Sequence, residues 1–121
     1  MCTRLVYKGD GGRVITARTM DWKSELPTNL WVFPRGLERD GAAGARSITW
    51  TSRYGSVIAS GYDISTTDGM NEAGLVANVL WLVESSYPSI DDGRPVLALS
   101  AWPQHALDNF ATVAEAVEEF A

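Results

Sequence analysis

The sequence has only one cysteine and one histidine among its 121 residues, Cys2 and His105. A single cysteine cannot form an internal disulfide bond, and this pair cannot supply the four ligands of a structural zinc site. Asp10 and Asp91–Asp92 lack the spacing of a calcium loop and are interpreted as turn residues. The sequence therefore predicts no metal and no cofactor.

Positive charge and long apolar runs are also scarce. Fifteen acidic residues face ten Lys and Arg residues, which gives a formal net charge of -5. No basic patch is visible, so we expect no nucleic-acid partner. No run approaches the ~20 apolar residues that span a bilayer, which predicts no membrane partner, and no leader segment is recognisable. As it stands the chain is expected to be cytoplasmic, while a periplasmic or secreted location stays open if a leader was removed.

Tryptophan, in contrast, is abundant for a chain of this length. Large indole rings build hydrophobic cores, and they also line apolar binding pockets. Trp31, Trp50 and Trp102 are assigned to the core by default. Trp22 and Trp81 are candidates for a substrate pocket, with core packing as the alternative for both.

The first part of the chain predicts a β-hairpin. Residues 3–8 and 13–18 are rich in β-branched and long side chains, and they flank the tetrad Gly9-Asp10-Gly11-Gly12. In an antiparallel hairpin the end of the second strand lies beside the start of the first. We therefore expect Arg18 to lie beside Cys2.

The middle of the chain predicts further strands. The expected elements are a strand at 30–33, an exposed loop at 37–45, a second hairpin of 46–51 with 56–60, a polar turn at 68–74, and a strand at 75–83. The last of these is almost wholly apolar and too short for a typical helix, so it is interpreted as a strand buried on both faces.

The last part of the chain changes to a helical period. Apolar residues from 96 to 107 share one helical face, and Pro103 would kink that helix or mark a restart near its first turn. Thr112 and Glu115 form a capping box that opens a helix at 113–120. Strands followed by helices predict a single α+β domain with an antiparallel sheet.

Cys2 is the candidate nucleophile. Removal of Met1 would place its thiol and a free α-amino group on one residue, and that amine titrates near ~7.7–8.0, which suits a general base. Arg18 would stabilise a thiolate and Asp21 would orient the α-amino group. The alternatives are a cysteine that only packs and a surface ion pair of little energetic value. His105 is interpreted as a solvent-facing helix residue outside the mechanism.

Four segments together resemble the choloylglycine hydrolase family, which comprises bile salt hydrolases and penicillin V acylases. They are Met1-Cys2-Thr3, Arg18-Thr19-Met20-Asp21-Trp22, Asp68-Gly69-Met70-Asn71-Glu72-Ala73-Gly74-Leu75 and Leu107-Asp108-Asn109-Phe110-Ala111-Thr112-Val113. The resemblance implies a four-layer αββα N-terminal nucleophile hydrolase fold, of which this chain would supply antiparallel strands followed by C-terminal helices.

The resemblance also implies roles for individual residues. Cys2 would be the nucleophile after loss of Met1, Arg18 its activating cation and Asp21 the partner of the α-amino group. The backbone N–H of Trp81 would be an oxyanion donor, at a position where many bile salt hydrolases have asparagine. Flat indole walls at Trp22 and Trp81 favour aromatic or long aliphatic acyl groups, as in penicillin V or acyl-homoserine lactones, over bile salts.

Two residues on which the family relies have no counterpart here, namely a second oxyanion donor from an asparagine side chain and a second arginine. Neither Asn71 nor Asn78 matches the motif of that asparagine. Residues 1–121 are therefore expected to be the N-terminal part of one domain, truncated within or after the helix at 113–120 and inactive or weak alone. The full-length protein is expected to be a homo-oligomer that hydrolyses a small-molecule amide. The alternative is an inactive fragment or a β-rich interaction module.

Overall fold

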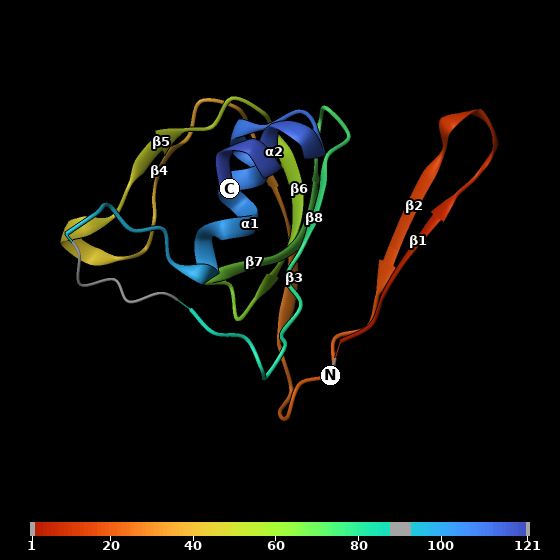
Figure 1. The fold of residues 1–121 in the computed structure, drawn as a ribbon, viewed down its shortest axis with the longest axis horizontal. Helices are drawn as coiled ribbons and strands as arrows, with labels where there is room; N and C mark the ends of the chain where they lie inside the picture. The colour runs from red at the N-terminus through yellow and green to blue at the C-terminus, as the bar shows by residue number, and fades with distance from the viewer. Residues whose placement is uncertain (1, 88–92, 121) are drawn as a thin grey trace. The chain divides into compact units, whose positions relative to one another are not determined.

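The computed structural model describes residues 2–87 and 93–120, which separate into two compact units (Figure 1). One unit consists of residues 2–26 and 80–87, and the other of residues 27–79 and 93–120. Asp91 and Asp92 lie outside the described residues.

The first unit is built on a β-hairpin. Strand β1 (Arg4–Lys8) pairs antiparallel with β2 (Val14–Arg18), and the rungs run from Arg4 opposite Arg18 to Lys8 opposite Val14. A 3-10 turn at Asp10–Gly12 joins them, and Gly11 and Gly12 adopt φ of 70° and 79°, which glycine reaches without a steric cost. The predicted hairpin is confirmed, including the return of its second strand toward the start of the first.

The second unit contains a four-stranded antiparallel sheet with the order β3-β6-β7-β8 and a separate pair of strands, β4 and β5. The bounds are β3 (Thr28–Phe33), β4 (Glu38–Asp40), β5 (Thr49–Thr51), β6 (Ser56–Gly61), β7 (Ser65–Asn71) and β8 (Val76–Asn78). β3 confirms the strand predicted at 30–33.

The second hairpin predicted from the sequence is wrong. β5 pairs with β4, inside the segment predicted as an exposed loop, whereas β6 pairs with β3 and β7. The short link between β5 and β6 does not close a hairpin because its polar groups have other partners. The Ser52 N–H donates to the Leu37 carbonyl at 2.9 Å, and the N–H groups of Arg53 and Tyr54 both donate to the Asp108 carbonyl.

The strand predicted at 75–83 is much shorter than expected. β8 ends at Asn78, and Leu82 and Val83 are 58% and 71% exposed, so a strand buried on both faces is ruled out for this segment. The predicted turn at 68–74 is mostly strand as well, because β7 continues to Asn71. An apolar run indicates that a segment can be buried, but it does not determine at which residue the strand ends.

Helices follow the strands, as predicted. α1 (Trp102–Asn109) is preceded by a 3-10 turn at Leu99–Ala101 and has Pro103 in its first turn, which confirms the restart and excludes a helix reaching back to residue 96. α2 (Val113–Phe120) opens with the predicted capping box: the Glu115 N–H donates to Thr112 Oγ1, and the Thr112 N–H donates to Glu115 Oε2. None of the described helices is long and apolar enough to cross a membrane.

α1 lies against one face of the four-stranded sheet (Figure 1). Leu107 is fully buried and Ile58 is 2% exposed, and these two side chains meet over Gly69. A Cβ atom at Gly69 would lie 2.7 Å from both of them, closer than such atoms approach. The glycine is therefore what lets the helix pack this close to β7.

The Asn71 side chain links the sheet to α1 through four hydrogen bonds, two donated and two accepted. Its Nδ2 donates to the carbonyls of Leu107 and Phe110 at 2.8 and 2.7 Å, at the C-terminal end of α1. Its Oδ1 accepts from the N–H groups of Ala73 and Leu75 at 3.1 and 2.9 Å, in the turn between β7 and β8. The residue is 2% exposed, so water does not substitute for these bonds.

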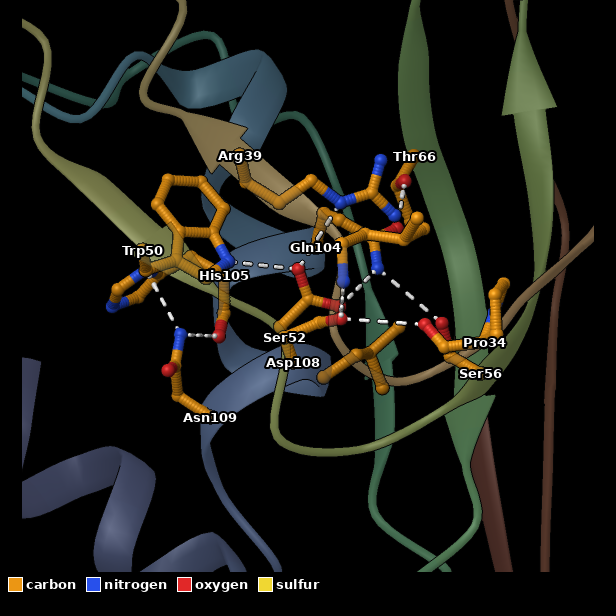
Figure 2. A network of polar contacts seen from close by, with 12 residues as sticks. Pro34, Arg39, Trp50, Ser52, Ser56, Thr66, Gln104, His105, Asp108 and Asn109 are labelled. Carbon is orange, nitrogen blue, oxygen red and sulfur yellow. Dashed lines mark hydrogen bonds and ion pairs between the residues drawn. The ribbon is translucent and has the colours of Figure 1, made fainter.

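A second buried polar network centres on Asp108, which has no exposed surface (Figure 2). Its carboxylate accepts from Trp50 Nε1 at 2.8 Å and from Gln104 Nε2 at 2.7 Å, and Arg39 Nε lies 3.4 Å away. Gln104 Oε1 in turn accepts from the Thr66 hydroxyl. The network connects α1 to β5, β4 and β7 through buried polar contacts.

We predict that Asn71→Asp destabilises the protein by ~3 kcal/mol, because a carboxylate oxygen would replace the amide donor and face the Leu107 and Phe110 carbonyls without a hydrogen to share. Denaturant unfolding followed by circular dichroism measures the change. Asn29→Asp is the matched comparison, because it also replaces an amide donor by a carboxylate facing an acceptor, the Asp63 carboxylate, but at an exposed site where water solvates both charges, so a smaller loss is expected. Equal midpoints for the two variants would contradict the role given to Asn71.

Candidate active site

Cys2 and Arg18 lie side by side at the open end of the hairpin. Arg18 Nη1 is 4.0 Å from Cys2 Sγ, and the two residues belong to the same compact unit. The antiparallel register produces this contact, because Arg18 stands opposite Arg4 and Cys2 comes two residues earlier. Cys2 is partly buried, so part of the residue remains exposed.

The surroundings of Cys2 favour the thiolate. Hydrogen bonds from the backbone N–H groups of Asp21 and, next in size, Trp81 lower the pKa of the Cys2 thiol from its ordinary value. Partial burial acts in the opposite direction, and the positive charge of Arg18 lowers the pKa further. A lowered pKa means that a larger fraction of the thiol is ionised near neutral pH, which is the reactive form.

The four residues predicted to be catalytic come together in one unit. Cys2, Arg18 and Asp21 lie in residues 2–26, and Trp81 lies in residues 80–87 of the same unit. Asp21 and Trp81 both direct a backbone N–H toward the sulfur. The roles assigned to these residues stay predictions, as does the pairing of the Asp21 carboxylate with an α-amino group.

Trp22 and Trp81 form an aromatic pair next to these donors. Their ring centroids are 5.8 Å apart with an angle of 71° between the planes, which is an edge-to-face contact. The side chains are 46% and 55% exposed, so the pair is not buried as a core in the described structure. Two accessible indoles near the Cys2 sulfur can contact an apolar group bound there.

His105 is not solvent-facing, contrary to the sequence-based interpretation. It is 8% exposed, and its ring contacts Trp50 edge-to-face at 4.7 Å together with Phe110 and Phe120. Burial lowers the pKa of His105 from its usual value, so the neutral ring is favoured. Its Nδ1 lies 3.2 Å from Asn109 Nδ2, and both residues belong to α1 in the second unit, which does not contain Cys2. That it lies outside the mechanism stays a prediction.

Two of the three tryptophans assigned to the core are in fact substantially exposed. Trp31 and Trp102 are 45% and 44% exposed, whereas Trp50 is half-buried and donates to Asp108. Trp31 donates from its indole N–H to Asp63, so one edge of the ring is held at the surface. Among residues 2–87 and 93–120, no group of three or more His, Cys, Asp or Glu side chains could hold a metal ion.

Sequence reasoning did not identify two features of this site. One is the backbone N–H of Asp21, the largest single influence on the Cys2 pKa, which leaves no signal in side-chain identity. The other is Thr19, which is hydrogen-bonded to Thr3, the residue after Cys2. Its place next to Arg18 in the motif was the only signal that pointed to it.

A thiol with a lowered pKa, a guanidinium 4.0 Å away and two backbone donors is an arrangement that can support a nucleophilic cysteine. Residues 2–121 match the family described as linear amide C-N hydrolases, choloylglycine hydrolase family. The chain belongs to this family.

Two similar proteins are penicillin V acylases. The chain is 55% identical over 126 aligned residues to the enzyme from Pectobacterium atrosepticum, covering 97% of this chain and 34% of that protein. It is 66% identical to the solved structure of penicillin V acylase from Agrobacterium tumefaciens, with a TM-score of 0.92 over 99% of this chain and 38% of that one. The α+β fold class is confirmed, and the chain spans a little over a third of the length of these relatives.

We predict that Arg18→Gln raises the pH at which Cys2 becomes reactive, because loss of the positive charge removes one of the influences that lower its pKa. The midpoint, measured from iodoacetamide alkylation rates against pH, should move upward but stay below that of a free thiol, since the backbone donors of Asp21 and Trp81 remain. Arg4→Gln, on the opposite strand, is the matched control and should leave the profile unchanged. An unshifted midpoint for Arg18→Gln would show that the 4.0 Å contact has no electrostatic effect.

Proposed function

We propose that the protein to which this chain contributes hydrolyses linear amides, with Cys2 as the nucleophile after removal of Met1. The observation that carries the proposal is the set of groups around the sulfur: the N–H groups of Asp21 and Trp81, and the Arg18 guanidinium 4.0 Å away. Membership in a family of linear amide C-N hydrolases and the similarity to two penicillin V acylases support the same reaction.

In the proposed acylation step the α-amino group of Cys2 accepts the thiol proton. The sulfur then attacks the amide carbon, and the carbonyl electron pair becomes an oxyanion. The backbone N–H of Trp81 already points toward the sulfur, so it can donate to an oxyanion formed on the carbon bonded to that sulfur. When the C–N bond breaks, the proton held by the α-ammonium passes to the departing amine, which leaves a thioester.

In the deacylation step a water molecule replaces the amine. The α-amino group takes a proton from the water as its oxygen attacks the thioester carbon, and a second oxyanion forms at the same donor. The C–S bond then breaks, the carboxylic acid leaves, and the proton returns to sulfur. Arg18 stabilises the thiolate at the start and at the end of this cycle.

The acyl group is proposed to be aromatic or long and aliphatic, with bile salts disfavoured. Trp22 and Trp81 present accessible indole surface beside Cys2, and each exposed ring face offers a flat apolar wall, the two ring planes lying at 71° to each other. A flat aromatic ring such as the phenoxy group of penicillin V, or the alkyl chain of an acyl-homoserine lactone, can bury most of its area against such a wall. A hydroxylated steroid would place polar groups against it.

The described chain accounts for one oxyanion donor. The proposal includes a second donor, from an asparagine side chain, and a second arginine, both from residues beyond 121, since the relatives are almost three times as long as the matched region. Loss of one oxyanion donor costs about 10²–10³-fold in rate, so residues 1–121 alone are proposed to be weak or inactive. Assembly of the full-length protein as a homo-oligomer is part of the proposal.

We predict that Cys2→Ala lowers penicillin V hydrolysis by the full-length protein by at least ~10³-fold, because no other group supplies the nucleophile. The purified wild-type chain should have the mass expected after loss of Met1, which mass spectrometry measures. Ala17→Ser, in β2, is a control substitution outside the site. Activity that survives in Cys2→Ala, or full activity with Met1 retained, would refute the mechanism.

A substrate panel tests the preference separately. We predict that kcat/KM for penicillin V exceeds that for glycocholate by at least ~10-fold, and that an acyl-homoserine lactone with a long chain lies closer to penicillin V. Trp22→Ala should reduce this ratio chiefly through KM, since it removes apolar contact area. Faster cleavage of glycocholate would overturn the assignment of the acyl group while leaving the nucleophile in place.

The rival function is a β-rich interaction module or an inactive relative, with an inert thiol. The lowered pKa of Cys2 favours the enzyme, because a cysteine that only packs needs no donors at its sulfur. Slow alkylation of Cys2 near neutral pH, at the rate of an ordinary thiol, would favour the rival.

A further inference from the structure

Thr19 is hydrogen-bonded to the residue that follows the nucleophile. Its backbone N–H donates to the Thr3 carbonyl at 2.9 Å, and its hydroxyl oxygen accepts from the Thr3 N–H at 3.2 Å. The hydrogen-bonded rungs of β1 and β2 end at Arg4 opposite Arg18, so this pair is one residue closer to Cys2 than the regular ladder. Thr19 therefore holds the N–H of the Cys2–Thr3 peptide and the carbonyl of the Thr3–Arg4 peptide.

The same residue contacts the activating cation. The Thr19 carbonyl accepts from Arg18 Nη1 at 3.5 Å, and that nitrogen is the one 4.0 Å from Cys2 Sγ. Thr19 is thus linked to both Cys2 and Arg18. It reaches Cys2 through its bonds to Thr3, and it contacts the Arg18 guanidinium through its carbonyl.

We infer that Thr19 is a positioning residue for the Cys2 nucleophile, and that its hydroxyl is the group that matters. The inference rests on the proposed function. In it, Thr19 acts on Cys2 through Thr3 and Arg18 and does not itself contact the reacting atoms. A hydroxyl that accepts from the Thr3 N–H holds the Cys2–Thr3 peptide plane, and with it the direction in which the thiol leaves the backbone.

Removal of Met1 makes this anchor more important. Once Cys2 is the first residue, its only covalent connection to the protein is the peptide bond to Thr3. Thr3 is exposed and precedes β1, so neither burial nor the strand ladder holds it. The two hydrogen bonds between Thr3 and Thr19 then restrain the backbone at the one residue to which Cys2 is bonded.

A small displacement of the nucleophile has a large effect on rate, because the near-attack geometry is demanding. The donors at the sulfur are the N–H groups of Asp21 and Trp81, which take no part in the Thr3–Thr19 bonds, so a displaced Cys2 meets them for a smaller fraction of the time. Loss of the hydroxyl should therefore affect both the ionisation of the thiol and the chemical step, and leave substrate contacts at Trp22 and Trp81 unchanged.

If Thr19 only stabilised the end of the hairpin, its substitution would change the melting temperature and not the reactivity of Cys2. Thr19 is exposed, and water can replace a lost hydrogen bond there, so the melting temperature of a variant reports only on the strand end. The pH profile of Cys2 alkylation and the division between kcat and KM report on the position of the thiol. The three measurements together separate the two roles.

The experiment compares Thr19→Val with Thr19→Ser in the full-length protein. Valine keeps the shape and both backbone groups but removes the hydroxyl, whereas serine retains it. We expect Thr19→Val to raise the midpoint of Cys2 alkylation against pH, to lower kcat for penicillin V by about tenfold, and to change KM by less than about twofold. Thr19→Ser should restore both the midpoint and kcat toward the wild-type values.

Thr16→Val, the same substitution three residues earlier on β2, is the matched control and should behave as the wild type. The inference is overturned if Thr19→Val retains the wild-type alkylation profile and kcat, if it lowers only the melting temperature, or if Thr19→Ser is impaired equally. Alkylation needs no turnover, so its midpoint tests Thr19 even if the wild-type protein cleaves none of the amides, a result that would refute the proposed function alone.

Discussion

The four hydrogen bonds of the Asn71 side chain are the constraint on which the larger unit depends. They attach the end of α1 to the turn after β7, and they hold Leu107 over Gly69, where no larger residue leaves room. The neighbouring Glu72 extends the junction by pairing with Arg35 and accepting from the Gly55 N–H. The segment from Asp68 to Leu75, one of the four on which the family resemblance rests, is therefore a structural junction in this unit.

The smaller unit is organised in the opposite way. The apolar side chains of its hairpin, such as Leu5 and Val14, are 63% and 59% exposed, so burial within the described hairpin contributes little to its order. The groups around Cys2 are the backbone N–H groups of Asp21 and Trp81 and the Arg18 guanidinium. Strand register places Arg18. A site of this kind is sensitive to small shifts of the main chain and tolerant of many side-chain changes around it.

The sequence predicted what depends on local pattern. The hairpin that brings Arg18 to Cys2, the restart at Pro103 and the capping box at Thr112 all follow from residue types at fixed spacings, and all are confirmed. Pairing partners were not predictable, because the alternation of β5 predicts a strand but not its partner. β5 pairs with β4, and the backbone groups that follow it bond to Leu37 and Asp108, which lie far from it in the sequence. The burial of His105 and the donors at Cys2 come from contacts between distant segments, which spacing along the chain does not encode.

Trp81 divides its two proposed contributions between its main chain and its side chain. The donor at the sulfur is an N–H that nineteen residue types possess in the same form, whereas the wall beside it is an indole. Under the proposed function, a substitution at position 81 would change the surface that contacts the acyl group and keep the N–H donor. Proline, which lacks that N–H, would be the exception. A position of this kind offers related enzymes a route by which they can diverge in specificity while the reaction itself is inherited unchanged.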